Sequence, residues 1–164
     1  MKTSMLVKSV AALALLGALP AAANQASYSG SLCTPVTISG QGTPTIFRSG
    51  RLLNQTTGTI EVVCPIQRNV TSSLTEDMSV SVTVVDAHYS ENVCCTATVA
   101  EYDGTSITSG SACTTGSDPS NPKIIGINLA SVFAGINGYV SLRCSVPARY
   151  NGFDSVLSSF VVTE

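Results

Sequence analysis

One short segment of the chain carries the residue types needed for acid–base catalysis. Asp86-Ala87-His88-Tyr89-Ser90-Glu91 brings a carboxylate, an imidazole and a hydroxyl within six positions. A hydrolase needs a nucleophile hydrogen-bonded to the histidine, which a third group must orient. The chain has no Gly-x-Ser-x-Gly turn, and its serines are spread widely. We therefore predict a polar turn without catalytic residues, and His88 is the residue to test if the protein is a small secreted hydrolase.

Two other segments offer oxygen ligands of the kind that Ca²⁺ prefers. They are Glu101-Tyr102-Asp103-Gly104 and Ser117-Asp118-Pro119-Ser120-Asn121. Ca²⁺ needs six or more oxygen ligands, and each segment has too few carboxylates alone. Side-chain-capped turns explain both segments, and Cys-x-x-Cys or Cys-x-x-His spacings typical of zinc are missing. We predict no metal site and no cofactor.

The six cysteines are the strongest chemical signal in the chain. They follow an export signal, so they are expected to meet an oxidising compartment and form a disulfide framework. Neighbouring Cα atoms lie about 3.8 Å apart, too close for an ordinary disulfide between Cys94 and Cys95. The candidates for disulfide bonding are Cys33, Cys64, Cys94, Cys95, Cys113 and Cys144.

Six cysteines permit fifteen pairings, and spacing alone does not choose among them. We favour Cys94 with Cys113, which closes a loop of about twenty residues and contributes on the order of 3 kcal/mol. Cys33, Cys64, Cys95 and Cys144 are then expected to pair among themselves. Cys95 shares a face with valines and is expected inside, bonded to Cys33 or Cys64. A bridge between Cys64 and Cys144 is also plausible, because both follow similar strand-like segments.

The elements that position these residues begin after an N-terminal signal peptide, residues 1–23. Lys2 and Lys8 form its basic part, the apolar run from Val10 to Leu19 is too short to span a bilayer, and Ala21-Ala22-Ala23 offers a cleavage site. Residues 24–164 then have the size of a single domain. We expect a secreted or periplasmic protein without a membrane span.

The charge of the chain argues against a nucleic-acid partner. Charged residues make up 11% of the sequence, and the six basic residues left after signal removal are scattered along it. Binding to phosphates needs clustered Lys and Arg. The partner is therefore expected to be a protein or a glycan at the cell surface.

Strand patterns recur along the chain, and helix patterns are nearly absent. Met78 to Val85 alternates apolar with hydroxyl residues, which predicts a strand inside a sheet, and Asp103-Gly104 predicts a hairpin turn. We expect a mobile loop over 108–122, one helical turn over 130–136, and final strands over 139–146 and 156–162. Thr59 to Cys64 is expected to be a strand stopped by Pro65.

This spacing predicts an all-β fold, an immunoglobulin-like antiparallel β-sandwich of about seven to nine strands stapled by up to three disulfides. On the first of the two final strands, Tyr139 and Arg143 lie on the same outer face. They are candidates for a binding patch. An ordinary exposed sheet surface is the competing interpretation.

From Cys33 to Glu164 the chain resembles an uncharacterised family of small secreted bacterial proteins. The residues that carry the resemblance are Cys33-Thr34-Pro35, Val63-Cys64-Pro65-Ile66, the strand ending at Asp86, Arg143-Cys144-Ser145-Val146-Pro147 and the closing Ser159 to Glu164. The resemblance implies no activity. We therefore expect an exported, non-enzymatic structural or interaction module, with a glycan-binding module as the alternative and a small secreted hydrolase as a third hypothesis.

Overall fold

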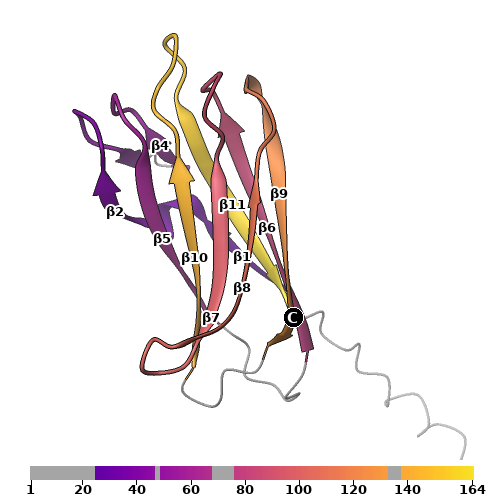
Figure 1. The fold of residues 1–164 in the computed structure, drawn as a ribbon. Coiled ribbons are helices and arrows are strands. Elements are labelled where there is room, and N and C mark those ends of the chain that lie inside the picture. The colour runs from indigo at the N-terminus through magenta and orange to yellow at the C-terminus, as the bar shows by residue number, and fades with distance from the viewer. Residues whose placement is uncertain (1–24, 47–48, 68–75, 133–137) are drawn as a thin grey trace, which may run out of the picture.

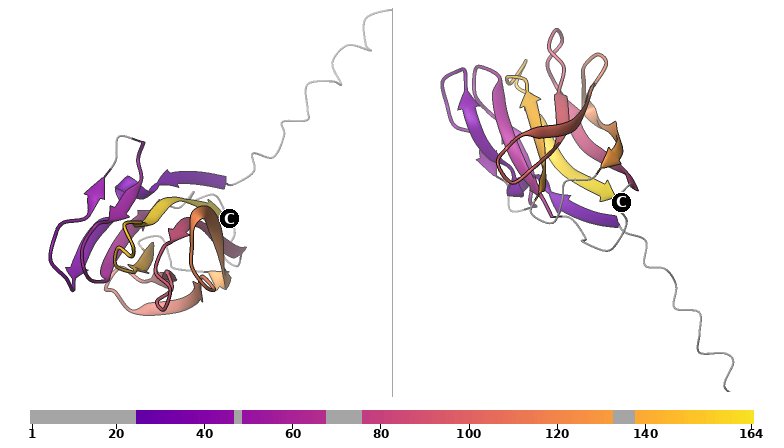
Figure 2. Two further views of the ribbon diagram at one scale, coloured as in Figure 1. Left: turned by 90° about the horizontal axis from the view of Figure 1, so that it is seen from above. Right: turned by 60° about the horizontal axis from the view of Figure 1, so that its bottom comes forward.

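The computed structural model describes residues 25–46, 49–67, 76–132 and 138–164, which form two antiparallel β-sheets packed face to face (Figure 1). The predicted signal peptide and residues 133–136 of the expected helical turn lie outside these residues. Figure 2 shows the two layers from the end of the sandwich.

Eleven strands run through the described residues. In chain order they are β1 (Gln25–Ser29), β2 (Thr34–Ile38), β3 (Thr45–Ile46), β4 (Leu52–Asn54), β5 (Ile60–Ile66), β6 (Glu76–Asp86), β7 (Cys94–Ala100), β8 (Ser106–Cys113), β9 (Asp118–Val132), β10 (Tyr139–Val146) and β11 (Ser155–Thr163), with a short 3₁₀ turn at Gly30–Leu32. The predicted β-sandwich is confirmed. The strand number exceeds the expected seven to nine because short pieces such as β3 and β4 form strands of their own.

Sheet A has the strand order β3-β4-β11-β6-β9, and β1 also pairs with β11. Sheet B has the order β2-β5-β10-β7-β8. The core lies between the sheets, where the inward residues of β6 (Met78, Val80, Val82 and Val84) are at most 2% exposed. Strand β6 pairs with β11 on one side and β9 on the other, so the prediction that this segment lies inside a sheet is confirmed.

The prediction of a mobile loop over 108–122 is wrong. Strand β8 runs to Cys113 and β9 begins at Asp118, so a short connection joins two long strands. The Ser- and Gly-rich composition suggested a loop, but Gly110 lets β8 lie close against β9 at the edge of the sandwich. Ala130–Val132, expected at the start of a helical turn, belong to β9.

Pro65 does not end its strand, because β5 continues to Ile66. Strand β2 pairs with β5 only from Ile60 to Val63, while β10 continues along the other side of β5. Pro65 therefore lies where the β2 neighbour has ended. Because no β2 residue lies opposite Pro65, the missing N–H of this proline removes no hydrogen bond between β5 and β2.

All three disulfides join neighbouring strands within sheet B. Cys33–Cys64 links the start of β2 to β5, Cys95–Cys144 links β7 to β10, and Cys94–Cys113 links β7 to β8. Cys94 is directly opposite Cys113, and Cys95 is directly opposite Cys144. The adjacent pair Cys94-Cys95 therefore ties β7 to both of its neighbours.

The favoured Cys94–Cys113 pairing is confirmed. The four remaining cysteines pair among themselves as predicted, and Cys95 is buried as expected. The predicted bond of Cys95 to Cys33 or Cys64 is wrong, as is the Cys64–Cys144 alternative. The reason is register: β5 and β10 are neighbours, but Leu142 lies opposite Cys64 and Val62 lies opposite Cys144. Cys64 and Cys144 are therefore not paired across the two strands, and their sulfur atoms do not face each other.

Within the described part of the chain, no helix is long and apolar enough to cross a bilayer.

Candidate binding site at the loop end of the sandwich

Three aromatic rings meet at one end of the sandwich. His88 and Tyr89 come from the β6–β7 loop and Tyr150 from the β10–β11 loop. The ring centroids of Tyr89 and Tyr150 are 4.8 Å apart, and His88 lies 5.2 Å from Tyr150 and 5.5 Å from Tyr89. Tyr89 is 66% exposed, so the cluster faces solvent.

A tight hairpin adds a fourth ring. Tyr150 and Phe153 are bridged by two backbone hydrogen bonds of 2.9 Å, with Asn151 and Gly152 at the turn. Both turn residues have positive φ, 49° and 84°, as a two-residue primed turn requires. Directly paired residues project to the same side, so Phe153, 52% exposed, flanks Tyr150. We call His88, Tyr89, Tyr150 and Phe153 the aromatic tip.

The β6–β7 loop is fixed from beneath by a buried carboxylate. Asp86 is fully buried at the end of β6 and accepts hydrogen bonds from the backbone N–H groups of His88 (3.3 Å) and Val93 (3.4 Å) and from the Thr114 hydroxyl. The Glu91 backbone N–H donates to His88 Nδ1 at 3.1 Å. The His88 ring is thus held by its own loop.

The β10–β11 loop is held by contacts with the β4–β5 loop. Gln55 Nε2 donates to Asp154 Oδ2 at 3.1 Å, and the Arg149 backbone N–H donates to the Thr56 carbonyl at 3.2 Å. Asn54, fully buried, donates to the carbonyls of Val146 and Pro147 at 2.9 and 2.8 Å. These contacts hold the loop that carries Tyr150 in place.

The residues considered for catalysis do not assemble into a relay. The Asp86 carboxylate contacts the His88 backbone and not its ring, and His88 Nδ1 is occupied by the Glu91 N–H. Ser90 Oγ lies 3.5 Å from the same nitrogen, at the outer limit of a hydrogen bond. The arrangement is that of the polar turn predicted from the sequence.

Both acidic segments considered for Ca²⁺ are capped turns, as predicted. Asp103 accepts a hydrogen bond from the Thr105 N–H (2.9 Å), and Asp118 accepts from the N–H groups of Ser120 (3.1 Å) and Asn121 (3.0 Å). The backbone donor of Thr105 lowers the pKa of Asp103. The pKa of Asp118 is lowered by the Asn121 side chain first and then by the backbone donors.

Comparison with solved structures gives the same fold. The C-terminal carbohydrate-binding module CBM6 of a marine laminarinase from Zobellia galactanivorans is similar with a TM-score of 0.51 and 12% identity over 86% of this chain and 100% of that one. An arabinose-bound α-L-arabinofuranosidase matches with a TM-score of 0.50 and 10% identity over 86% of this chain and 25% of the enzyme. The module CBM35 from Cellvibrio japonicus Abf62 has a TM-score of 0.47 and 13% identity over 85% of this chain and 93% of that one.

The likeness to the first two structures shows a shared β-sandwich fold. No family model and no curated protein matches the sequence. A shared fold does not define a shared function, which depends on the residues of the site.

The patch predicted at Tyr139 and Arg143 lies elsewhere, on the outer face of sheet B. Tyr139 begins β10 and is 46% exposed, while Arg143 pairs with Glu61 of β5. A role of the Tyr139 and Arg143 patch in binding stays a prediction.

The sequence analysis did not predict the hairpin from Tyr150 to Phe153 or the position of Phe153 beside Tyr150. The signal that could have found them is Asn151-Gly152, a strong two-residue turn signal between the last two strands. Such a turn places the residues on either side of it next to each other at a loop tip.

Proposed function

We propose that this protein is an exported, non-catalytic carbohydrate-binding module that binds glycans on the aromatic tip. The observation that carries the proposal is the contact of the rings of His88, Tyr89 and Tyr150 at an exposed loop end. Aromatic faces are large apolar surfaces at low entropic cost, and the C–H faces of sugar rings stack on them. The fold shared with a carbohydrate-binding module supports the proposal.

The fixed geometry of the loops favours binding. A ligand that meets rings already in place does not bear the cost of ordering them, which is about 0.5–1.5 kcal/mol for each immobilised side chain. Asp86 beneath one loop and Asn54 beneath the other supply this order. The described residues of the tip also present polar rim groups, among them Asn151, that can fix the orientation of sugar hydroxyls.

The disulfides support the same function. Three disulfides are stable in an oxidising compartment, and glycans of cell surfaces and polysaccharides are found outside the cytoplasm. The proposed location is the periplasm or the exterior of the cell.

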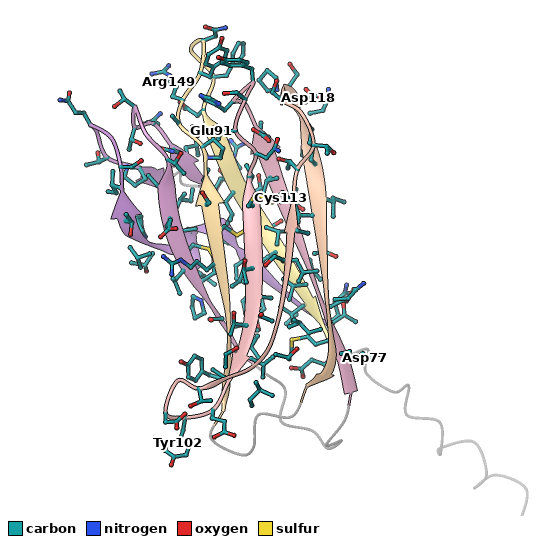
Figure 3. The ribbon with its side chains drawn as sticks, in the orientation of Figure 1. Asp77, Glu91, Tyr102, Cys113, Asp118 and Arg149 are labelled. Carbon is teal, nitrogen blue, oxygen red and sulfur yellow. A yellow bond between two sulfur atoms is a disulfide. The ribbon has the colours of Figure 1, made fainter. Side chains whose placement is uncertain are left out.

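The test is a glycan array with the oxidised protein, followed by calorimetry on any glycan that binds. Tyr89→Ala and Tyr150→Ala are each expected to weaken binding about fivefold or more, since a ring stacked on an aromatic side chain, as measured for nucleic-acid bases, is worth roughly 1–3 kcal/mol. The matched control is Tyr102→Ala, because Tyr102 is 76% exposed at the opposite end of the sandwich (Figure 3). Wild-type protein that binds no glycan, or tip variants that bind as the control does, would contradict the proposal.

Tyr139 and Arg143 on the outer face of sheet B form a second, weaker candidate surface for the same function. Tyr139→Ala in the same assay decides between them. Loss of binding with Tyr139→Ala and retention with Tyr150→Ala would move the site to the outer face of sheet B.

A further inference from the structure

The turn that joins Tyr150 to Phe153 carries a chemically reactive pair of residues. In an asparagine–glycine sequence, the backbone nitrogen of the glycine can attack the side-chain amide of the asparagine, because glycine has no side chain to shield that nitrogen. Asn151 and Gly152 are both exposed, and they are the two central residues of the turn. The fold therefore presents this pair to water at the aromatic tip itself.

Both reacting groups are free of competing hydrogen bonds. The two backbone hydrogen bonds of the turn join Tyr150 and Phe153. Among the described residues, the Gly152 N–H and the Asn151 side-chain amide have no hydrogen-bond partner. Arg149 Nη2 donates to the Gly152 carbonyl at 3.1 Å, and that carbonyl belongs to the next peptide group along the chain. The attacking nitrogen and the amide carbon that it attacks are thus both accessible.

A rotation of one peptide plane brings the two groups together. With φ of 49° and 84°, Asn151 and Gly152 are the central residues of a type I′ turn. Turning the peptide between them gives a type II′ turn, in which ψ of the first central residue is about −120° and φ of the second about −80°. Gly152 permits this change, since glycine adopts either sign of φ. At that ψ the Gly152 nitrogen is eclipsed with Cβ of Asn151, the arrangement from which a five-membered ring closes.

The hairpin stays closed during this rotation. Types I′ and II′ both connect paired strands through two residues, so the hydrogen bonds of 2.9 Å between Tyr150 and Phe153 are kept. The rotated state is a minor one, because a residue with a Cβ atom is strained at positive φ with extended ψ. A small population of reactive turns is therefore available without unfolding of the loop.

We propose that Asn151 is a modification site, at which the side-chain amide becomes a carboxylate by deamidation through a cyclic imide. The Gly152 nitrogen forms a bond to Cγ of Asn151, and the bond from Cγ to the side-chain amino group breaks. The proton of the Gly152 N–H leaves with that amino group as ammonia. Water then opens the ring at either carbonyl, which yields aspartate or isoaspartate, and no electron is gained or lost.

The isoaspartate product changes the aromatic tip. Its main chain runs through the former side chain, so one more carbon atom enters the backbone between Tyr150 and Phe153. The geometry of a two-residue hairpin turn is then lost, and with it the direct pairing that places Phe153 beside Tyr150. This modification goes beyond the proposed function, because it alters the tip whatever ligand the tip binds.

The test is incubation of the folded, oxidised protein at mildly alkaline pH, followed by trypsin digestion and mass spectrometry against an unincubated sample. No lysine or arginine follows Arg149, so cleavage there releases residues 150–164, in which Asn151 is the only amide side chain. A gain in mass equal to the difference between a hydroxyl and an amino group is therefore assigned to Asn151. Synthetic peptides with aspartate or isoaspartate identify the product by chromatography.

Asn128 is the internal control, because it is exposed but lies within β9, paired with β6, and is followed by leucine. Fragment ions separate it from Asn137, which lies in the same tryptic peptide. We expect Asn151 to convert at least about tenfold faster than Asn128, a difference of about 1.4 kcal/mol in the barrier. Hydrogen exchange of the Phe153 N–H should be faster in the isoaspartate form. Conversion of Asn151 that is less than tenfold faster than that of Asn128 would overturn the proposal.

Gly152→Ala tests the route of the reaction. An added Cβ atom meets no atom within 4 Å, but it shields the attacking nitrogen, so conversion of Asn151 should fall sharply. Gly126→Ala is the matched variant in β9, where an added Cβ atom is equally unhindered, and it should convert as wild type does. Equal conversion of Asn151 in the two variants would contradict attack by the Gly152 nitrogen. These outcomes do not depend on the glycan array, because an empty array leaves the modification site standing and an unreactive Asn151 leaves glycan binding standing.

Discussion

A single buried carboxylate holds the loop that carries half of the aromatic tip. Asp86 lies fully buried at the end of β6, and its hydrogen-bond donors come from its own loop and from the connection after β8. A buried charge is tolerated only when donors replace the water it has lost. Asp86 therefore joins three segments at one point beneath the candidate site.

Thr114→Val removes the hydroxyl donor to Asp86 at nearly constant volume. We expect a loss of about 2 kcal/mol in the free energy of unfolding, because a charged buried acceptor is left short of one donor. Urea denaturation measures it. Thr96→Val is the control, since Thr96 Oγ1 bonds Ser111 Oγ on the exposed outer face of sheet B, and it should cost less than about 0.5 kcal/mol. Equal effects of the two variants would show that the Thr114 hydroxyl adds nothing to the stability of the buried carboxylate.

Asp118 makes a pH-dependent contribution with a defined sign. The Asn121 side chain, the N–H groups of Ser120 and Asn121 and the charge of Lys123 all hold its pKa below the ordinary value of 3.8. Because the folded-state pKa is below the unfolded one, the stabilisation is complete above the unfolded pKa and is lost as pH falls through the folded pKa.

We expect Asn121→Ala to raise the pKa of Asp118 toward its ordinary value, since the largest cause of the shift is removed. Carboxyl NMR titration of wild type and variant measures this directly. An unchanged Asp118 pKa in the variant would contradict the assignment.

At the scale of elements, β8 and β9 close one edge of the sandwich although they belong to different sheets. A Cβ atom on Gly110 of β8 would lie 2.9 Å from the Asn128 carbonyl oxygen and 3.0 Å from Ile127 Cγ2, both in β9. The absence of a side chain at Gly110 therefore sets how closely the two strands pack. This close contact with β9 stabilises β8 as a strand, although the composition of the segment predicts a loop.

Gly110→Ala is expected to destabilise the protein by about 1–3 kcal/mol, because backbone atoms of β9 must move to accommodate the methyl group. Gly126→Ala is the matched control within β9 itself, where a Cβ atom has no neighbour within 4 Å. That variant should be neutral or slightly stabilising, since glycine is unfavourable inside a strand. Thermal unfolding of both variants gives the comparison, and a Gly110→Ala protein as stable as wild type would show that the two strands are not closely packed here.

At the scale of the whole molecule, covalent cross-links are concentrated in one layer. The three disulfides bridge β2–β5, β10–β7 and β7–β8, which are three of the four strand pairings of sheet B. Sheet A is joined to sheet B through the shared apolar core, in which Phe160, Leu157 and Leu142 are fully buried. The sandwich thus combines a stapled sheet with a sheet held by packing.

The Cys95–Cys144 bond should contribute more to stability than the Cys94–Cys113 bond. It spans 49 residues and is buried, whereas Cys94–Cys113 spans 19 residues and has an exposed end. Loop-closure entropy assigns about 4 kcal/mol to the longer loop and about 3 kcal/mol to the shorter, and the buried pair also leaves a cavity when it is removed. Denaturation of the double variants Cys95→Ala/Cys144→Ala and Cys94→Ala/Cys113→Ala should show the first as the less stable. The reverse order would contradict this ranking.

The amino-acid sequence by itself determined the features that depend on near neighbours in the chain. Alternation over Met78 to Val85 and over Tyr139 to Val146 identifies strands because side chains in a strand alternate between faces. The Asp103-Gly104 turn brings Cys94 opposite Cys113, so that disulfide could also be predicted from local geometry. The all-β sandwich follows from many such patterns together.

Only the tertiary structure decided the features that depend on how distant strands align. Strand register, which short segments do not encode, placed Cys144 opposite Cys95 and Leu142 opposite Cys64. The packing of one sheet edge on the other turned a loop-like segment into β8. The meeting of His88 and Tyr89 with Tyr150 likewise requires two loops, far apart in the chain, to leave the same end of the sandwich. Local periodicity specifies the strands, whereas packing between distant strands specifies which side chains meet.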